Sequence, residues 1–160
     1  MKFPKTPLTV GCIAAVAALL VDQGTKAIVV ANAASLRDGL PVFSGFNLVF
    51  LRNDGVTFGL LSGVPWWGLV VLALVICAWI TGLMLRTQDR VEAFGYGLVI
   101  GGALGNVLDR VRYGAVTDFL DLYVGSVHWP SFNMADALLV SGLAILILRP
   151  TAGTRRIGAG

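Results

Sequence analysis

Two aspartates, Asp118 and Asp136, each stand beside an apolar run of the sequence and are separated by 18 positions. Asp136 opens a hydrophobic segment, where a carboxylate is costly to keep and usually serves a function. Two carboxylates held close together cannot both ionise easily, so they can share one proton and supply an acid and a base. The pair predicts a membrane-embedded aspartyl hydrolase that uses water at the edge of a bilayer.

The composition predicts an integral membrane protein with a single domain. The chain has 160 residues, of which 56% are hydrophobic and only 13% are charged, and its mean hydropathy is +0.81. Soluble domains carry about 25% charged residues. The net charge of +3 is modest and no basic stripe with interleaved aromatics is visible, so nucleic acid is not expected as a partner.

The cysteines and the histidine do not predict a metal or cofactor site. Cys12 and Cys77 both lie within apolar runs and lack metal-ligand spacing. His128 has no histidine or cysteine nearby with which it could share a zinc ion. We therefore expect no metal and no cofactor, and we interpret His128 as a solvated loop residue.

Four hydrophobic segments predict a mostly α-helical membrane protein with four transmembrane helices, at about 8–31, 66–85, 93–111 and 133–148. In the first segment, Asp22 and Lys26 are four residues apart and can pair on one helix face. Such a charged pair should point towards protein or a wet cavity. Alternatively, Ala31-Asn32-Ala33 resembles a signal-peptide cleavage site, although signal peptides seldom carry an Asp and a Lys before the cut.

The segments outside these spans predict a small β-sheet region at about 35–64 and an outer interfacial loop or helix. Phe46–Leu51 and Val56–Leu61 are β-prone and flank the turn signal Asn53-Asp54-Gly55, which favours a hairpin. We expect residues 113–132 to form an aromatic-rich loop at the membrane interface.

Gly97, Gly101 and Gly105 occur at every fourth position and predict a smooth helix face that lets a neighbouring helix approach closely. We expect this row to bring the third and fourth spans together, and with them the two aspartates.

The distribution of lysine and arginine predicts the orientation in the membrane. Of the twelve, Lys26 lies in a span and four lie on the side of residues 32–65 and 113–132. The other seven share the side of both termini and the 86–92 loop. The positive-inside rule therefore places both termini in the cytoplasm and the candidate polar residues at the outer face.

Five motifs occur in an order that closely resembles the bacterial lipoprotein signal peptidase family, also called signal peptidase II. The motifs are Asp22-Gln23-x-x-Lys26, Arg52-Asn53-x-Gly55-x-x-Phe58-Gly59, Gly101-Gly102-Ala103-Leu104-Gly105-Asn106-x-x-Asp109-Arg110, Val116-x-Asp118-Phe119 and Phe132-Asn133-x-Ala135-Asp136. Met134 stands where a branched aliphatic residue is common, at a variable position.

The resemblance implies an aspartyl endopeptidase of the bacterial inner membrane, active at its outer face. It would remove the signal peptide from diacylglyceryl-modified prolipoproteins, cutting just before the lipidated cysteine. Asp118 and Asp136 match the catalytic pair. The residues that match surrounding motif positions are Asp22, Lys26, Asn53, Gly55, Asn106, Asp109, Arg110 and Asn133. The expected partners are the lipid-modified substrate and membrane lipids, and the expected state is a monomer.

The residues alone leave other interpretations open. Asp118 could be a helix cap or surface charge, and Asp136 could stabilise a helix N-terminus. Asn53 could be a turn residue, Asp22–Lys26 and Asp109–Arg110 could be structural ion pairs or interface anchors, and Arg110 could hold a lipid phosphate. A small transporter would also carry intramembrane charges, but the polar residues gather at one face and no repeat is visible. A membrane scaffold would not need the two aspartates.

Overall fold

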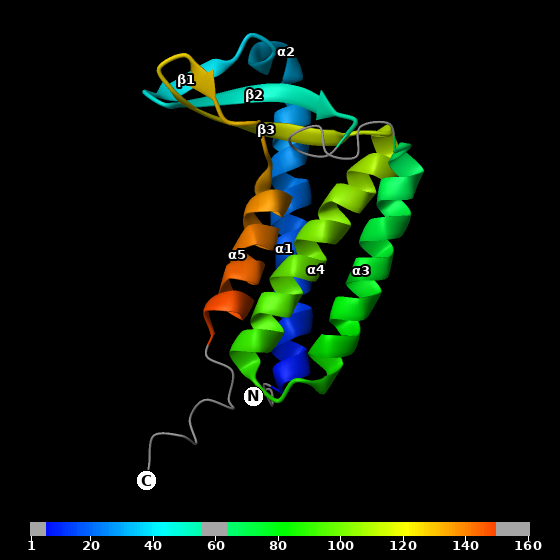
Figure 1. Cartoon of the computed structure of the whole chain (residues 1–160). Coiled ribbons are helices and arrows are strands. Elements are labelled where there is room, and N and C mark those ends of the chain that lie inside the picture. Colours follow the sequence, from blue (N-terminus) through cyan, green and yellow to red (C-terminus); the bar gives the residue numbers. More distant parts are fainter. Residues whose placement is uncertain (1–5, 56–63, 150–160) are drawn as a thin grey trace.

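A computed structural model describes residues 6–55 and 64–149. Figure 1 shows a bundle of long helices with a small sheet lying across one end. The long helices are α1 (Pro7–Ala31), α3 (Trp66–Arg86), α4 (Arg90–Tyr113) and α5 (Met134–Leu148). The helices α1, α3 and α4 are long and apolar enough to cross a membrane, whereas α5 is a shorter apolar helix.

Local signals set the ends of the helices. Thr6 accepts a hydrogen bond from the Thr9 backbone N–H and is followed by Pro7 in the first turn of α1. Asp89 caps α4, which ends at Gly114 in the left-handed conformation, with φ of 70°. Large apolar side chains stay exposed along α1, α3 and α5, as expected for surfaces that face lipid and not water.

The helix α4 is the centre of the bundle, and its glycines permit the closest contacts. A Cβ at Gly97 or Gly101 would collide with the backbone of α1, and one at Gly105 would collide with the Asp22 carboxylate. The row therefore faces α1, so the expectation that it joins the third and fourth spans was wrong. Gly102 instead lies against the backbone of α5 at Ala135.

We expect Gly101→Ala to destabilise the protein, because the new methyl group would press on the Ala15 carbonyl and the Ala18 side chain. Overpacking of this kind costs about 1–3 kcal/mol. Gly24→Ala is the matched control, since nothing lies within 4 Å of the added carbon there. Thermal unfolding in detergent should show a lower Tm for the first variant alone. Equal Tm values would contradict the close α1–α4 packing.

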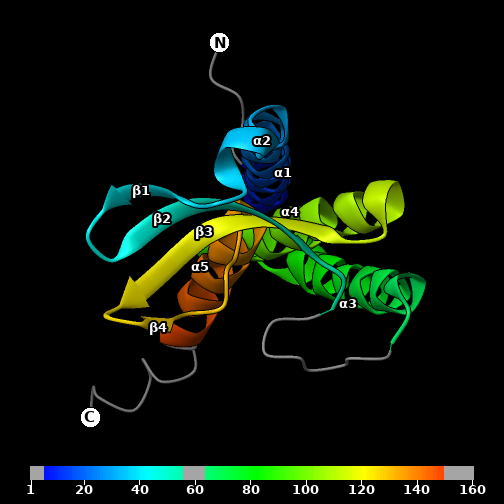
Figure 2. The same ribbon diagram turned by 90° about the horizontal axis from the view of Figure 1, so that it is seen from above.

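The sheet contains four antiparallel strands in the order β1 (Leu40–Phe43), β2 (Phe46–Asn53), β3 (Val116–Val124) and β4 (Val127–His128). A short helix, α2 (Ala33–Leu36), precedes it. Seen from above, the strands β2 and β3 cross the end of the bundle side by side (Figure 2).

The sheet differs from the one expected from the sequence. Residues 46–53 form a strand as predicted, but this strand pairs with β1 and β3, and the expected partner Val56–Leu61 lies outside the described residues. The expectation that 113–132 is a loop was wrong, because most of it forms β3 and β4. The residues Val116, Phe119 and Asp121 of β3 are buried, and the strand gains its backbone partners from β2, far away in sequence.

Candidate active site

Asp118 and Asp136 come from different elements and meet through Asn133. Asp118 lies near the start of β3, and Asp136 lies in the first turn of α5, which Asn133 caps. The Asn133 Nδ2 donates to Asp118 Oδ1 at 2.6 Å, and its backbone N–H donates to Asp136 Oδ2 at 3.3 Å. The Asn133 Oδ1 accepts from the Asp136 backbone N–H at 3.1 Å. Asp136 therefore does take part in a capping box, and the same box ties it to Asp118.

Asn106 supplies a second connection between the aspartates. Its Nδ2 donates to Asp136 Oδ1 at 2.8 Å, while its Oδ1 accepts from Asn133 Nδ2 at 3.2 Å and from Lys26 Nζ at 3.0 Å. Because two donors face the Asn106 carbonyl oxygen, its amide nitrogen is directed to Asp136. Lys26 thus controls the orientation of a side chain that holds one of the aspartates.

Asn53 contacts the other aspartate from the end of β2. Its Nδ2 donates to Asp118 Oδ2 at 2.8 Å, and its Oδ1 accepts from the Gly55 backbone N–H at 3.0 Å. Asn53 is therefore both a turn residue and a site residue. The Arg110 Nη2 donates to the Gly55 carbonyl at 3.0 Å, which connects α4 with the same turn.

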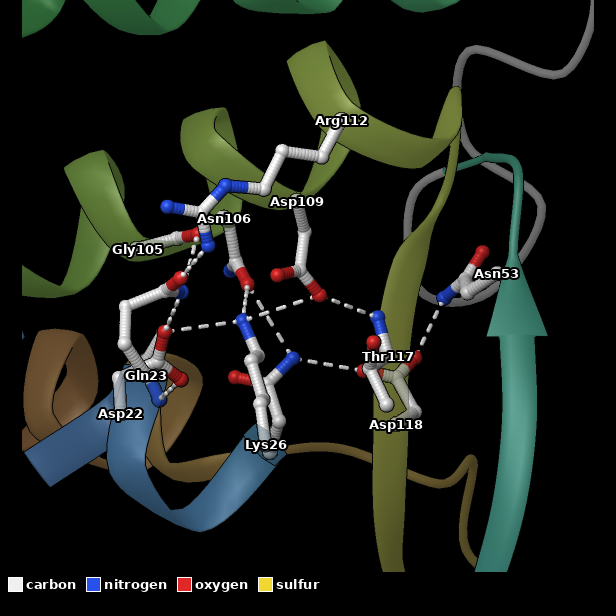
Figure 3. A network of polar contacts seen from close by, with 12 residues as sticks. Asp22, Gln23, Lys26, Asn53, Gly105, Asn106, Asp109, Arg112, Thr117 and Asp118 are labelled. Carbon is white, nitrogen blue, oxygen red and sulfur yellow. Dashed lines mark hydrogen bonds and ion pairs between the residues drawn. The ribbon is translucent and has the colours of Figure 1, made fainter. Parts of the chain in front are cut away.

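Asp22, Lys26 and Asp109 form a buried ion triad, which Figure 3 shows together with Asn106, Thr117 and Asp118. The Lys26 Nζ lies 3.0 Å from Asp22 Oδ2 and 3.6 Å from Asp109 Oδ2. The inward orientation expected for Asp22 and Lys26 is confirmed, because both are almost completely buried.

Each acid of the triad holds the backbone just before one of the two aspartates. Asp22 Oδ1 accepts from the Ala135 N–H at 3.0 Å, and Ala135 precedes Asp136. Asp109 Oδ2 accepts from the Thr117 N–H at 2.8 Å, and Thr117 precedes Asp118. Lys26 is therefore the common counter-ion of Asp22 and Asp109, the two acids that hold this backbone.

Of the two interpretations left open for Asp109 and Arg110, an ion pair with each other is not what the structure describes. Within the described residues, Asp109 pairs with Lys26, and its neighbour on the helix points elsewhere because consecutive residues lie about 100° apart around a helix axis. The charge of Arg110 interacts at longer range with Asp136 and Asp118 as well as with Asp109. Its Nε is buried and has no hydrogen-bond partner among the described residues.

Sequence reasoning missed several residues that support the site. The Gln23 Nε2 donates to Asp22 Oδ2 at 3.0 Å and to the Gly105 carbonyl at 3.2 Å. The Arg112 Nη1 in turn donates to Gln23 Oε1 at 2.7 Å. Arg52 donates to Thr117 Oγ1 at 2.8 Å. Gln23 and Arg52 are themselves part of the quoted motifs, and that was the signal that could have identified them.

Burial raises the pKa of the Asp118 carboxyl from 3.8 to about 6. Hydrogen bonds from Asn53 and Asn133 lower the pKa, and the charge of Asp136 raises it. Asp118 can therefore hold a proton near neutral pH beside a second carboxylate. Interacting acids of this kind titrate as a unit, so the proton belongs to the pair.

We expect Asp118→Asn to stabilise the protein relative to the wild type as the pH rises. The folded wild type has a raised Asp118 pKa and so favours the protonated carboxyl. The stability that the wild type gains from this carboxyl is complete below pH 3.8 and is lost as the pH rises through about 6. Between pH 4.5 and 7.5 the free energy of unfolding of Asp118→Asn should rise relative to that of the wild type by about 2 kcal/mol. Thermal unfolding of both proteins at the two pH values measures it. A constant Tm difference would contradict the raised pKa.

A cavity of about 490 Å³ opens beside the aspartates. Asp118, Asp136, Asn53, Asn106 and Arg110 line its polar end. The rest of its wall is apolar and comes mainly from α3, with contributions from α4 and α5; it includes Leu72, Ile76, Trp79, Val99, Leu139 and Leu143. The site therefore combines an acid pair with an apolar cavity wall.

Comparisons with known proteins agree with this arrangement. The family model described as signal peptidase (SPase) II matches residues 14–151. The lipoprotein signal peptidase of Syntrophus aciditrophicus is 40% identical over 153 residues, covering 90% of this chain and 93% of that protein. That of Cupriavidus taiwanensis is 42% identical over 134 residues, covering 81% of this chain and 76% of that protein.

Two solved structures described as bacterial membrane enzymes share the fold. One has a TM-score of 0.79 and 27% identity and covers 94% of both chains. The other has a TM-score of 0.75 and 30% identity, covering 88% of this chain and 94% of that one. The resemblance predicted from the five motifs is confirmed by the family model and the relatives. The chain belongs to the signal peptidase II family, the family of the lipoprotein signal peptidases.

Proposed function

We propose that Asp118 and Asp136 are the catalytic pair with which this membrane peptidase removes signal peptides from lipoproteins. The observation that carries the proposal is the network that joins them, because Asn133 contacts both carboxylates and Asn106 contacts one of them. The raised pKa of Asp118 supports it further, since a shared proton makes one group an acid and the other a base.

The proposed reaction is direct attack by water on the scissile carbonyl. The ionised aspartate takes a proton from the water, and the water oxygen bonds to the carbonyl carbon. At the same time the protonated aspartate donates its proton to the carbonyl oxygen. When the tetrahedral intermediate collapses, the C–N bond breaks and a proton passes from the pair to the leaving amine. The residues Asn53, Asn106 and Asn133 keep the two carboxylates oriented through this exchange.

The cavity supplies the proposed binding site for the substrate. Its polar end contains the acid pair, where the peptide bond before the lipidated cysteine would lie. Its apolar wall along α3 is open to the hydrophobic helix of a signal peptide and to acyl chains. Arg110 and the Gly55 turn close the polar end.

We further propose that α5 is a fourth span and that the sheet lies at the outer face of the inner membrane. At 15 residues, α5 extends about 22 Å, less than a hydrocarbon core of about 30 Å, a mismatch that local thinning of the bilayer accommodates. The end of α3, the start of α4 and the end of α5 lie opposite the sheet (Figure 1). Seven of the lysines and arginines belong to the loop and terminal sequences of that side and four to the sheet side, so the positive-inside rule assigns that side to the cytoplasm. The protein would act as a monomer, because one chain supplies both aspartates.

The proposed substrate is tested with purified protein and two forms of one precursor, with and without diacylglycerol on the cysteine. We expect the lipidated form to be cut immediately before its cysteine, as read by mass spectrometry of both products. The unmodified form should be cut much more slowly. Equal cleavage of the two forms, or a cut elsewhere, would show that the lipid is not recognised.

A further inference from the structure

The backbone between Asp118 and Asp136 folds back on itself. The register in which the returning segment pairs with β3 sets the position of Asn133. The strand β3 continues from Asp118 to Val124, and the chain returns through β4 towards Asn133. The Trp129 N–H donates to the Leu122 carbonyl at 2.7 Å. The Phe132 carbonyl then accepts from the N–H groups of Phe119 at 3.0 Å and Leu120 at 2.9 Å. Asn133 follows directly.

Apolar packing does little to hold this return strand. The strand β4 has two residues, and the facing side chains Val124 and Val127 are 85% and 73% exposed. Hairpins without an apolar face are marginally stable in water. A slip of one residue would move the strand by about 3.3 Å and reverse its faces. That exceeds the tolerance of the 2.6 Å bond from Asn133 to Asp118.

Asp121 of β3 and His128 of β4 form a polar pair that joins the two strands of this hairpin. The His128 Nδ1 lies 2.8 Å from Asp121 Oδ1 and 3.0 Å from Oδ2. His128 is the register partner of Tyr123, two residues along from Asp121, so it reaches its acid diagonally on one face of the sheet. The rings of Tyr123 and His128 stack with centroids 5.0 Å apart.

The Asp121 carboxylate joins three strands. Asn47 of β2 is its register partner and donates from Nδ2 to Oδ2 at 2.9 Å. Burial raises the pKa of Asp121, but the hydrogen bonds from His128 and Asn47 lower it more, so it stays below its usual range. An ionised carboxylate only accepts, so His128 Nδ1 carries the proton of this bond. Hydrogen bonds to a charged acceptor are about twice as strong as neutral ones.

We propose that Asp121 and His128 are positioning residues for catalysis, which fix the register of the segment that brings Asn133 and Asp136 to Asp118. This inference rests on the proposed assignment of Asp118 and Asp136 as the catalytic pair. The pair acts through the backbone and Asn133, without touching the substrate. Loss of the hydrogen bond between Asp121 and His128 should therefore lower kcat more than it raises KM, since the apolar cavity wall stays unchanged.

The test compares two substitutions at one position, His128→Leu and His128→Asn. Leucine removes the donor, whereas asparagine keeps an N–H at the place of Nδ1. We expect His128→Leu to lower kcat by about 10- to 100-fold, the cost of a misplacement of about 1 Å, with KM changed less than about twofold. His128→Asn should recover kcat to within about threefold of the wild type. Ser126→Ala, an exposed change in the same turn, is the control and should match the wild type.

The inference is overturned if His128→Leu retains the wild-type kcat, if KM rises and kcat does not fall, or if His128→Asn is as impaired as the leucine variant. Should His128→Leu not fold, Asp121→Asn replaces it, since it keeps the size of the side chain and removes its charge. Hydrogen exchange at the Phe119, Leu120 and Phe132 amides gives a readout without catalysis. Exchange should be faster in His128→Leu and as slow as in the wild type in His128→Asn.

Full activity of Asp136→Asn would refute the proposed function and not the role of the pair in the strand register. The hydrogen-exchange measurement would then still test that role.

Discussion

Asp118→Asn and Asp136→Asn should each lower the cleavage rate of a lipidated precursor by about 10³-fold or more, because each leaves the site without its acid or its base. The amides are close in size to the carboxyls, and Asn133 and Asn106 can still hydrogen-bond to them. The fold should therefore survive, and the Tm should not fall. Single-turnover cleavage, followed on a gel with excess enzyme, measures the chemical step.

Asp38→Asn is the matched control for this pair of variants. Asp38 is an exposed aspartate between α2 and β1, so the same chemical change there should leave the rate unaltered. A loss of activity in the control would point to a general effect of charge. Cleavage abolished by a metal chelator would point to a mechanism that the two aspartates do not explain.

Lys26→Met should be strongly damaging although Lys26 lies outside the proposed catalytic pair. It leaves Asp22 and Asp109 buried without their common cation, and breaking a buried ion pair costs about 3–5 kcal/mol. It also removes one of the two donors to the Asn106 carbonyl and leaves only Asn133 Nδ2, so the amide that holds Asp136 is less firmly oriented. We expect a clearly lower Tm and a rate reduced by about 10²-fold.

A triple variant separates the two effects of Lys26. Adding Asp22→Asn and Asp109→Asn removes the uncompensated charges, so much of the lost stability should return. The amide oxygens can still accept from the Ala135 and Thr117 N–H groups, but Asn106 still lacks its hydrogen bond from Lys26. The Tm should rise towards the wild type while the rate stays low. An unchanged Tm and rate in Lys26→Met would show that the lysine is not the counter-ion of the site.

Patterns local in the sequence predicted the helices and the polar residues well. The apolar runs predicted four helices whose observed bounds differ by only a few residues, because a long apolar run and the polar residues that end it are both visible in the local sequence. The motif spacing identified Asn53, Asn106 and Asn133, which the structure places around the two aspartates. Asp22 and Lys26 were predictable as a pair because residues four apart share a helix face.

Contacts between distant segments were not predictable in the same way. The spacing of Gly97, Gly101 and Gly105 indicates a smooth face but not which helix packs on it, and α1 does so instead of α5. The strand β3 pairs with β2, which is far away in sequence, and the Thr117 N–H at its start donates to Asp109 of α4. Local propensity predicts neither contact. The contact between Asp121 and His128 follows from the turn between them, which the prediction of a loop concealed.

The most direct test of the proposed catalytic pair compares Asp118→Asn, Asp136→Asn and the double variant in single turnovers on one lipidated precursor. If the two aspartates share one proton and act on one water, either single change removes the whole function of the unit. The double variant should then cleave at the same residual rate as each single variant, within about threefold. A single variant that cleaves at the wild-type rate, or losses that multiply in the double variant, would contradict a shared acid–base pair.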